Sequence, residues 1–165
     1  MPEKRTMQRA RRDRRQGKAP STQAGEFVRE EIEHIRAGKH GARSTKQAIA
    51  IGLSKARRAG VDLRPPEIGK ASTSTRKKAQ RDYERGHRAP SRQRATAKRS
   101  SATRNALKRE GRKSASHEAL SKQAHSAAKR RTKRERSAAA KKAARTKGQT
   151  KARATAPAHE HAAHP

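Results

Sequence analysis

The sequence predicts a mostly α-helical chain with extensive disorder, in which a short helical hairpin is flanked by basic arms and no sheet is present. Two observations lead to this fold class. Hydrophobic residues make up only 28% of the chain, against roughly 45–50% in soluble domains, so most of it lacks the apolar surface that offsets chain entropy. Large apolar side chains at helical spacing are confined to residues 21–66.

Residues 21–66 carry two stretches of apolar side chains placed three or four residues apart, as on one face of a helix. Six large side chains on these stripes form the predicted hairpin core: Phe27, Val28, Ile32, Ile35, Ile49 and Leu53. A core of this size does not offset the entropy of ordering about 38 residues. The hairpin is therefore either marginal alone or pairs with a second copy of the chain, as a homodimer, into a four-helix bundle.

Residues between and after the two stretches mark where the helices begin and end. Gly38 ends the first helix, and Ser44, with Gln47 three residues later, forms a capping box at the start of the second. Gly60 fits the left-handed position that follows a helix, and Pro65-Pro66 prevents continuation. These signals define a helix-turn-helix hairpin.

The rest of the chain is polycationic. It has 46 Lys and Arg against 14 Asp and Glu, a net charge of +32, and residues 71–165 hold most of the excess. Because like charges repel and little apolar surface is present, these parts are expected to lack stable structure alone. The predicted segments are a disordered basic arm at 1–20, a basic linker with transient helices at 67–111, a Lys/Arg/Ala-rich tail at 112–150 that is helical when bound, and a disordered His-containing tail at 151–165.

A polycation of this density is attracted to a polyanion by release of condensed counterions, an effect that does not depend on sequence. The basic residues expected to contact phosphate lie near the N-terminus and in the C-terminal tail: Arg11, Arg12, Arg14, Arg15, Lys129, Arg130, Arg131, Lys133, Arg134, Arg136, Lys141, Lys142, Arg145 and Lys147. The only aromatic residues, Phe27 and Tyr83, cannot form a platform on which bases stack.

These observations favour sequence-independent binding of duplex DNA by a histone-like or nucleoid-associated protein. Two other functions remain open at this level. An RNA- or ribosome-associated protein has a similar composition, and a plasmid-maintenance or adaptor protein could act through the hairpin alone. Sequence-specific reading is not expected, because the second helix offers Lys46, Lys55, Arg57 and Arg58 but, apart from Gln47, no row of Asn or Arg side chains on a base-facing stripe.

Residues 42–60, with the sequence ARSTKQAIAIGLSKARRAG, resemble the core motif of a family of small basic bacterial proteins. Members of that family are labelled DNA-binding or plasmid stabilization. The stretch KKAARTK at residues 141–147 is similar to the Lys/Ala-rich tail of linker-histone-like bacterial proteins. Both resemblances imply a DNA partner, and neither implies catalytic residues.

Patterns that support catalysis or metal binding are weak or missing, so we expect no enzyme activity, no cofactor and no metal site. The chain has no cysteine, which removes thiolate chemistry and Cys-based zinc sites. A group of side chains at the C-terminus could hold a metal ion but lacks a scaffold: His159, Glu160, His161 and His164. The other histidines have no ligand spacing and are expected on the surface: His34, His40, His87, His117 and His125.

The sequence also bears on location. Its longest wholly apolar run, residues 48–51, is far shorter than the roughly 20 residues that cross a bilayer. The first twenty residues have no apolar segment of the kind found in secretory signals. We therefore expect a protein of the cytoplasm, at the nucleoid, without a membrane partner.

Overall fold

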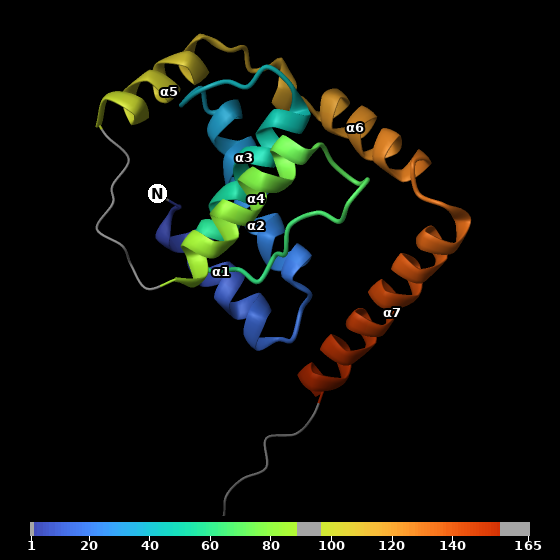
Figure 1. The fold of residues 1–165 in the computed structure, drawn as a ribbon. Coiled ribbons are helices and arrows are strands. Elements are labelled where there is room, and N and C mark those ends of the chain that lie inside the picture. Colours follow the sequence, from blue (N-terminus) through green and yellow to red (C-terminus); the bar gives the residue numbers. More distant parts are fainter. Residues whose placement is uncertain (1, 89–96, 156–165) are drawn as a thin grey trace, which may run out of the picture. The chain divides into compact units, whose positions relative to one another are not determined.

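The computed structural model describes residues 2–88 and 97–155. Within these two ranges the chain is mostly helical, with one short 3-10 helix and no β-strand, which confirms the predicted fold class (Figure 1). The elements are α1 (Lys4–Arg15), α2 (Pro20–Arg36), α3 (Thr45–Arg58), α4 (Thr73–His87), α5 (Ala97–Arg109), η1 (Lys113–Ala115), α6 (His117–Lys129) and α7 (Lys133–Thr155). The chain divides into two compact units, residues 1–125 and 126–165, which are described separately.

Helices α2 and α3 form the hairpin, with the boundary signals that the sequence indicates. The Ser44 hydroxyl caps α3 by accepting a hydrogen bond from the Gln47 amide. Gly38 and Gly60 follow the two helices with φ angles of 74° and 83°, the left-handed conformation that glycine adopts at no steric cost. After Gly60, the amide of Val61 donates to the carbonyl of Ala56, which closes the last turn of α3.

The contact between α2 and α3 is made by small residues. Ala48, Gly52 and Ala56 lie four residues apart on α3 and are all buried. A Cβ atom added at Gly52 would lie 2.6 Å from Val28 Cα, so the two helix backbones are in direct contact. The prediction of Ile49 as a core residue is not met, because this close approach places the small residues in the interface and leaves Ile49 half-buried, outside both apolar clusters.

Two apolar clusters hold the first unit together. One contains Ala10, Ala24, Phe27, Ala56 and Val61, and the other contains Ile32, Ile35, Ala42, Ala48 and Ala115. Phe27, Ile32 and Ile35 are buried as predicted, while Val28 and Leu53 are partly buried against the second and the first cluster respectively. The clusters draw on helices beyond the hairpin, so other parts of the chain supply the apolar surface that the hairpin lacks.

Helix α1 differs from the disordered arm expected for residues 1–20. It packs against α2 and buries Thr6, Ala10 and Asp13, which recur at helical spacing on one side. Arg9 lies 3.6 Å from the Glu26 carboxylate of α2. The charge repulsion expected of an isolated arm is thus reduced by carboxylates, including one from a different helix, whose position the local sequence does not give.

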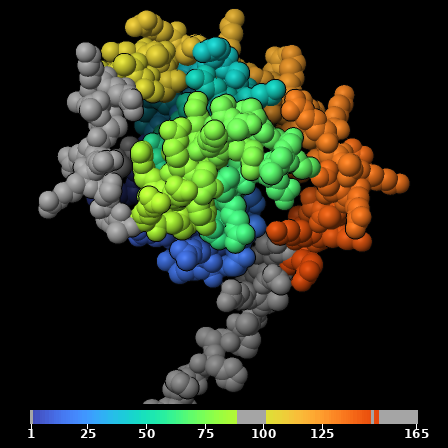
Figure 2. Space-filling view, viewed as in Figure 1, coloured from blue at the N-terminus to red at the C-terminus, as the bar shows by residue number. Residues whose placement is uncertain are grey.

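Helix α4 lies across α3 and covers it in the space-filling view (Figure 2). The Ser54 hydroxyl and the Arg58 guanidinium of α3 both contact the Asp82 carboxylate, at 2.5 and 3.6 Å. Tyr83 donates a hydrogen bond of 2.7 Å to Asp62 in the loop after α3. A segment expected to form only transient helices is therefore, at residues 73–87, anchored to the hairpin.

The end of α5 and the chain between α5 and α6 also belong to the first unit. The amide of Gly41 donates to the Leu107 carbonyl at 2.8 Å, and the Thr45 hydroxyl donates to the Ser114 carbonyl at 2.7 Å. Ala115 of η1 is fully buried in the second apolar cluster. The folded unit thus extends across boundaries that the sequence analysis placed at residues 66 and 111.

The second unit contains the end of α6 and the long helix α7. The sequence predicts one helical segment from 112 to 150, but the structure interrupts it between Lys129 and Lys133. Thr132 and Glu135 form a capping box there, in which each side chain accepts the other residue's amide hydrogen, at 3.2 and 2.8 Å. Helicity continues to Thr155, into the stretch 151–165 expected to be disordered, and the candidate metal group at residues 159–164 lies outside the described residues.

Candidate nucleic-acid interface

Four arginines near the end of α1 form an exposed basic face on the first unit: Arg11, Arg12, Arg14 and Arg15. At 100° per residue these positions span roughly 160° of the helix circumference. The buried residues of α1, including Ala10 and Asp13, lie on the other side. Folding of α1 therefore concentrates the predicted N-terminal phosphate contacts on one surface.

The second unit carries the predicted C-terminal contacts around α7. All ten are exposed: Lys129, Arg130, Arg131, Lys133, Arg134, Arg136, Lys141, Lys142, Arg145 and Lys147. Arg134, Lys141 and Arg145 are spaced at i, i+7 and i+11, which places them within about 40° of one another on the helix and over a length of about 16 Å. The helix therefore carries one continuous basic stripe, with further cations around it.

Three acidic residues of the first unit are buried in its interior, and a fourth pairs with a neighbouring helix. Asp13, Glu30 and Glu31 have side chains that are 5% exposed or less, and each is paired with a lysine of the same unit. Asp82 pairs with Arg58 at 3.6 Å. Because these four carboxylates are paired with other cations, they do not neutralise the exposed arginines of α1, which keep a positive surface charge.

Polar side chains of α3 are also used internally, so this helix offers little for reading bases. The Gln47 side chain accepts a hydrogen bond from the Arg43 amide at 2.8 Å. Arg57 is buried, donates to the Leu63 carbonyl at 3.0 Å, and has its pKa lowered by burial. A recognition helix presents such groups to the major groove instead.

Neither aromatic residue offers a free platform for base stacking. Phe27 is completely buried in the first apolar cluster. The Tyr83 ring stacks on His87 with a centroid distance of 4.1 Å, and its hydroxyl is bonded to Asp62. The arrangement favours contact with phosphates over contact with unstacked bases.

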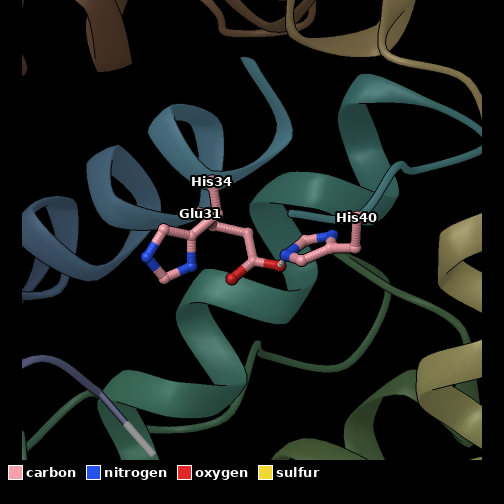
Figure 3. Close-up of side chains that lie close together, drawn as sticks. All are labelled: Glu31, His34 and His40. Carbon is pink, nitrogen blue, oxygen red and sulfur yellow. Dashed lines mark ion pairs between the residues drawn. The ribbon is translucent and has the colours of Figure 1, made fainter. Parts of the chain in front are cut away.

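One cluster was not expected from the sequence. His34 and His40 were predicted to be surface residues, but their side chains are only 15% exposed and lie next to the buried carboxylate of Glu31 (Figure 3). Each of the three can offer one ligand atom, and these atoms lie within 4.8 Å of one another. The spacing of Glu31 and His34, three residues apart on one helix, could have indicated a pair of metal ligands. The position of His40 beside them depends on the turn at Gly38, which the spacing does not reveal.

No protein-family model, curated protein or solved structure matches the chain. The resemblances of residues 42–60 and 141–147 to small basic and linker-histone-like bacterial proteins therefore remain expectations from sequence. In the part of the chain that the structure describes, none of the helices has the length and apolar character needed to cross a membrane.

Proposed function

We propose that this chain binds duplex DNA through the phosphate backbone, without reading its sequence, as a histone-like or nucleoid-associated protein. The observation that carries the proposal is the separation of charge within the fold. The exposed faces of α1 and α7 are rich in arginine and lysine, whereas Asp13, Glu30, Glu31 and Asp82 of the first unit form ion pairs within that unit. Such surfaces attract a polyanion by counterion release.

The two basic surfaces differ in how their helices are held in place, and this difference suggests different roles. The arginines of α1 sit on a helix packed against α2, so their spacing is preset before binding. Helix α7 has a capping box at Thr132 but exposes every side chain described between residues 130 and 145. Phosphates would relieve repulsion among the cations of α7 and so stabilise this helix on DNA.

The contacts available to α3 and to the aromatic residues support a non-specific mode. Gln47 and Arg57 are bonded within the unit, and Phe27 is buried. With no row of free side chains suited to base edges on α3, unrelated duplexes of equal length should compete within about tenfold. A sequence-specific protein would separate them by about a thousandfold or more.

The proposal is tested by measuring affinity for a short duplex over a range of salt concentrations. The variant Arg134→Ala/Lys141→Ala/Arg145→Ala removes the basic stripe of α7. The matched control, Lys77→Ala/Lys78→Ala/Arg81→Ala, removes the same number of charges from exposed positions on α4. At about 0.9 in slope for each phosphate contact, the α7 variant should reduce the slope of log K against log salt by up to about 2.7.

The α4 control distinguishes the loss of a specific contact surface on α7 from a general effect of lowering the net charge by three. If the α7 and α4 variants lose the same affinity and the same slope, binding is diffuse and the assignment to α7 is wrong. A strong preference for one of two unrelated duplexes would contradict the non-specific mode. Tighter binding to structured RNA than to DNA of equal length, in the same titration, would instead favour a ribosome- or RNA-associated function.

A further inference from the structure

Two buried carboxylates of α2 share a single ammonium group. The side chains of Glu30 and Glu31 are 2% and 1% exposed. Lys55 Nζ lies 2.5 Å from Glu31 Oε2 and 3.6 Å from Glu30 Oε1, and Glu30 Oε2 accepts a hydrogen bond from the backbone amide of Glu3, at 3.1 Å. A buried charge is costly unless it is paired, so one negative charge at this point requires another cation.

The Glu31 carboxylate lies between two imidazoles (Figure 3). His40 Nε2 lies 3.2 Å from Glu31 Oε1, and His34 lies on the other side of the same carboxylate (Figure 3). In a tetrahedral site with metal–ligand bonds of 2.0–2.2 Å, neighbouring ligand atoms are about 3.3 Å apart. The His40–Glu31 distance already has this length, and a small rotation would bring His34, whose ligand atom lies within 4.8 Å of the others, into the same sphere.

The outer nitrogens of both imidazoles are held by oxygen acceptors. His34 Nε2 lies 2.8 Å from Glu3 Oε1, and His40 Nδ1 lies 3.1 Å from the carbonyl oxygen of Gly41. Metal-ligating histidines commonly donate their second N–H to a carboxylate or a backbone carbonyl, which fixes the tautomer and leaves the other nitrogen free to bind.

We propose that Glu31, His34 and His40 bind one divalent transition-metal ion, with Zn²⁺ the best fit to two imidazoles and a carboxylate. Glu31 would bind through Oε1 while Oε2 keeps its ion pair with Lys55. The two imidazole side chains are each 15% exposed, and a water molecule would take the fourth position. Bound metal would join the last turns of α2 to the loop before α3.

This site does not depend on DNA binding, and its test uses the full chain. Three histidines close to the C-terminus could bind metal by themselves, so the parent protein for all measurements carries His159→Ala/His161→Ala/His164→Ala. Zn²⁺ affinity and stoichiometry are measured by calorimetric titration. Co²⁺ serves as a spectroscopic probe, because its visible absorption is intense in tetrahedral sites and weak in octahedral ones.

The parent should bind one Zn²⁺ and give the intense Co²⁺ spectrum. His34→Ala and His40→Ala should each weaken Zn²⁺ binding at least about a hundredfold and abolish that spectrum, and Glu3→Ala should weaken it about 10- to 100-fold by releasing His34. The control is His125→Ala, at an exposed position of α6, which should change affinity by less than about twofold. Saturating Zn²⁺ should raise the parent's melting temperature by roughly 10 °C.

Several results would overturn the proposal. If the parent binds no Zn²⁺ at a ratio of one to one, there is no metal site at Glu31. Binding that survives both His34→Ala and His40→Ala would place the metal elsewhere. Far-ultraviolet circular dichroism of His40→Ala and of the more conservative His40→Gln separates loss of the ligand from loss of the fold, and Zn²⁺ binding by folded His40→Gln with parental affinity would also refute the assignment.

Discussion

Replacing Gly52 by alanine tests the backbone contact on which the first unit is built. A Cβ atom there would lie 2.6 Å from Val28 Cα and 2.9 Å from Val28 N. Ordinary contact begins at 3.4 Å, so α2 and α3 would have to separate by roughly 0.8 Å, and neither neighbour can rotate away because both are backbone atoms. Overpacking of this kind costs about 1–3 kcal/mol, occasionally more.

The matched control is Gly25→Ala in α2. A Cβ atom at Gly25 would meet nothing within 4 Å, and both glycines lie inside helices. Alanine stabilises a helix interior by about 1 kcal/mol relative to glycine, and this gain applies to both variants. We therefore expect Gly25→Ala to stabilise the first unit by up to about 1 kcal/mol and Gly52→Ala to destabilise it by up to about 2 kcal/mol.

Urea unfolding measures both changes. Tyr83 is the only tyrosine, and the chain has no tryptophan, so its fluorescence reports on the first unit alone, whereas circular dichroism would also record α7. Each variant is compared with the unsubstituted chain, from which it differs at a single glycine. Equal stability of the two variants would mean that α2 and α3 do not approach as closely as described, and the account of their interface would be wrong.

Three further predictions concern other parts of the chain. Ser44→Ala removes the cap of α3 and should lower the free energy of unfolding by about 1 kcal/mol in the same urea assay, and an unchanged value would refute the capping role. The hydrogen bond to Asp62 raises the pKa of Tyr83 above 10.0, so its stabilising effect should be present below pH 10 and be lost as the pH rises through the higher folded value. Asp62→Asn should then lower the tyrosine titration midpoint, followed by ultraviolet absorbance, and no shift would contradict that bond. Deleting residues 126–165, which carry twelve Lys or Arg and two Glu for a net +10, should weaken duplex binding in a filter or anisotropy assay by about a hundredfold or more while Tyr83 fluorescence is unchanged. Equal affinity of the full chain and the chain without residues 126–165 would refute α7 as the main contact. The deletion starts after residue 125 because a cut before Ala115 would remove a buried core residue.

The sequence could predict those features that depend on neighbouring residues. The helical class, the capping serine at residue 44 and the stop at Gly60 follow from local hydrogen bonding and backbone freedom, and the structure contains each of them. The burial of Phe27 and Ile35 follows from apolar spacing. The cap at Thr132 was also readable, since a glutamate follows three residues later, but the long run of helix-forming residues concealed it.

Features that depend on pairs of distant residues could not be predicted in this way. Apolar spacing alone favoured Ile49 for the core, because it does not reveal that Gly52 allows two backbones to touch and so turns the small face of α3 inward. Charge density alone predicted a disordered N-terminal arm, because the position of Glu26 opposite Arg9 is set by the packing of α1 on α2.

For the candidate site, too, some features follow from the sequence and others only from the tertiary structure. The sequence by itself determined that the chain is a polycation without cysteine and with two aromatic residues, and this composition limits the partner and the mode of contact. Only the tertiary structure decided which charges remain on the surface and which are buried. It also brought His40 to Glu31 across the turn at Gly38, because the energy of a buried carboxylate depends on which groups surround it in space, and the order of residues along the chain does not specify them.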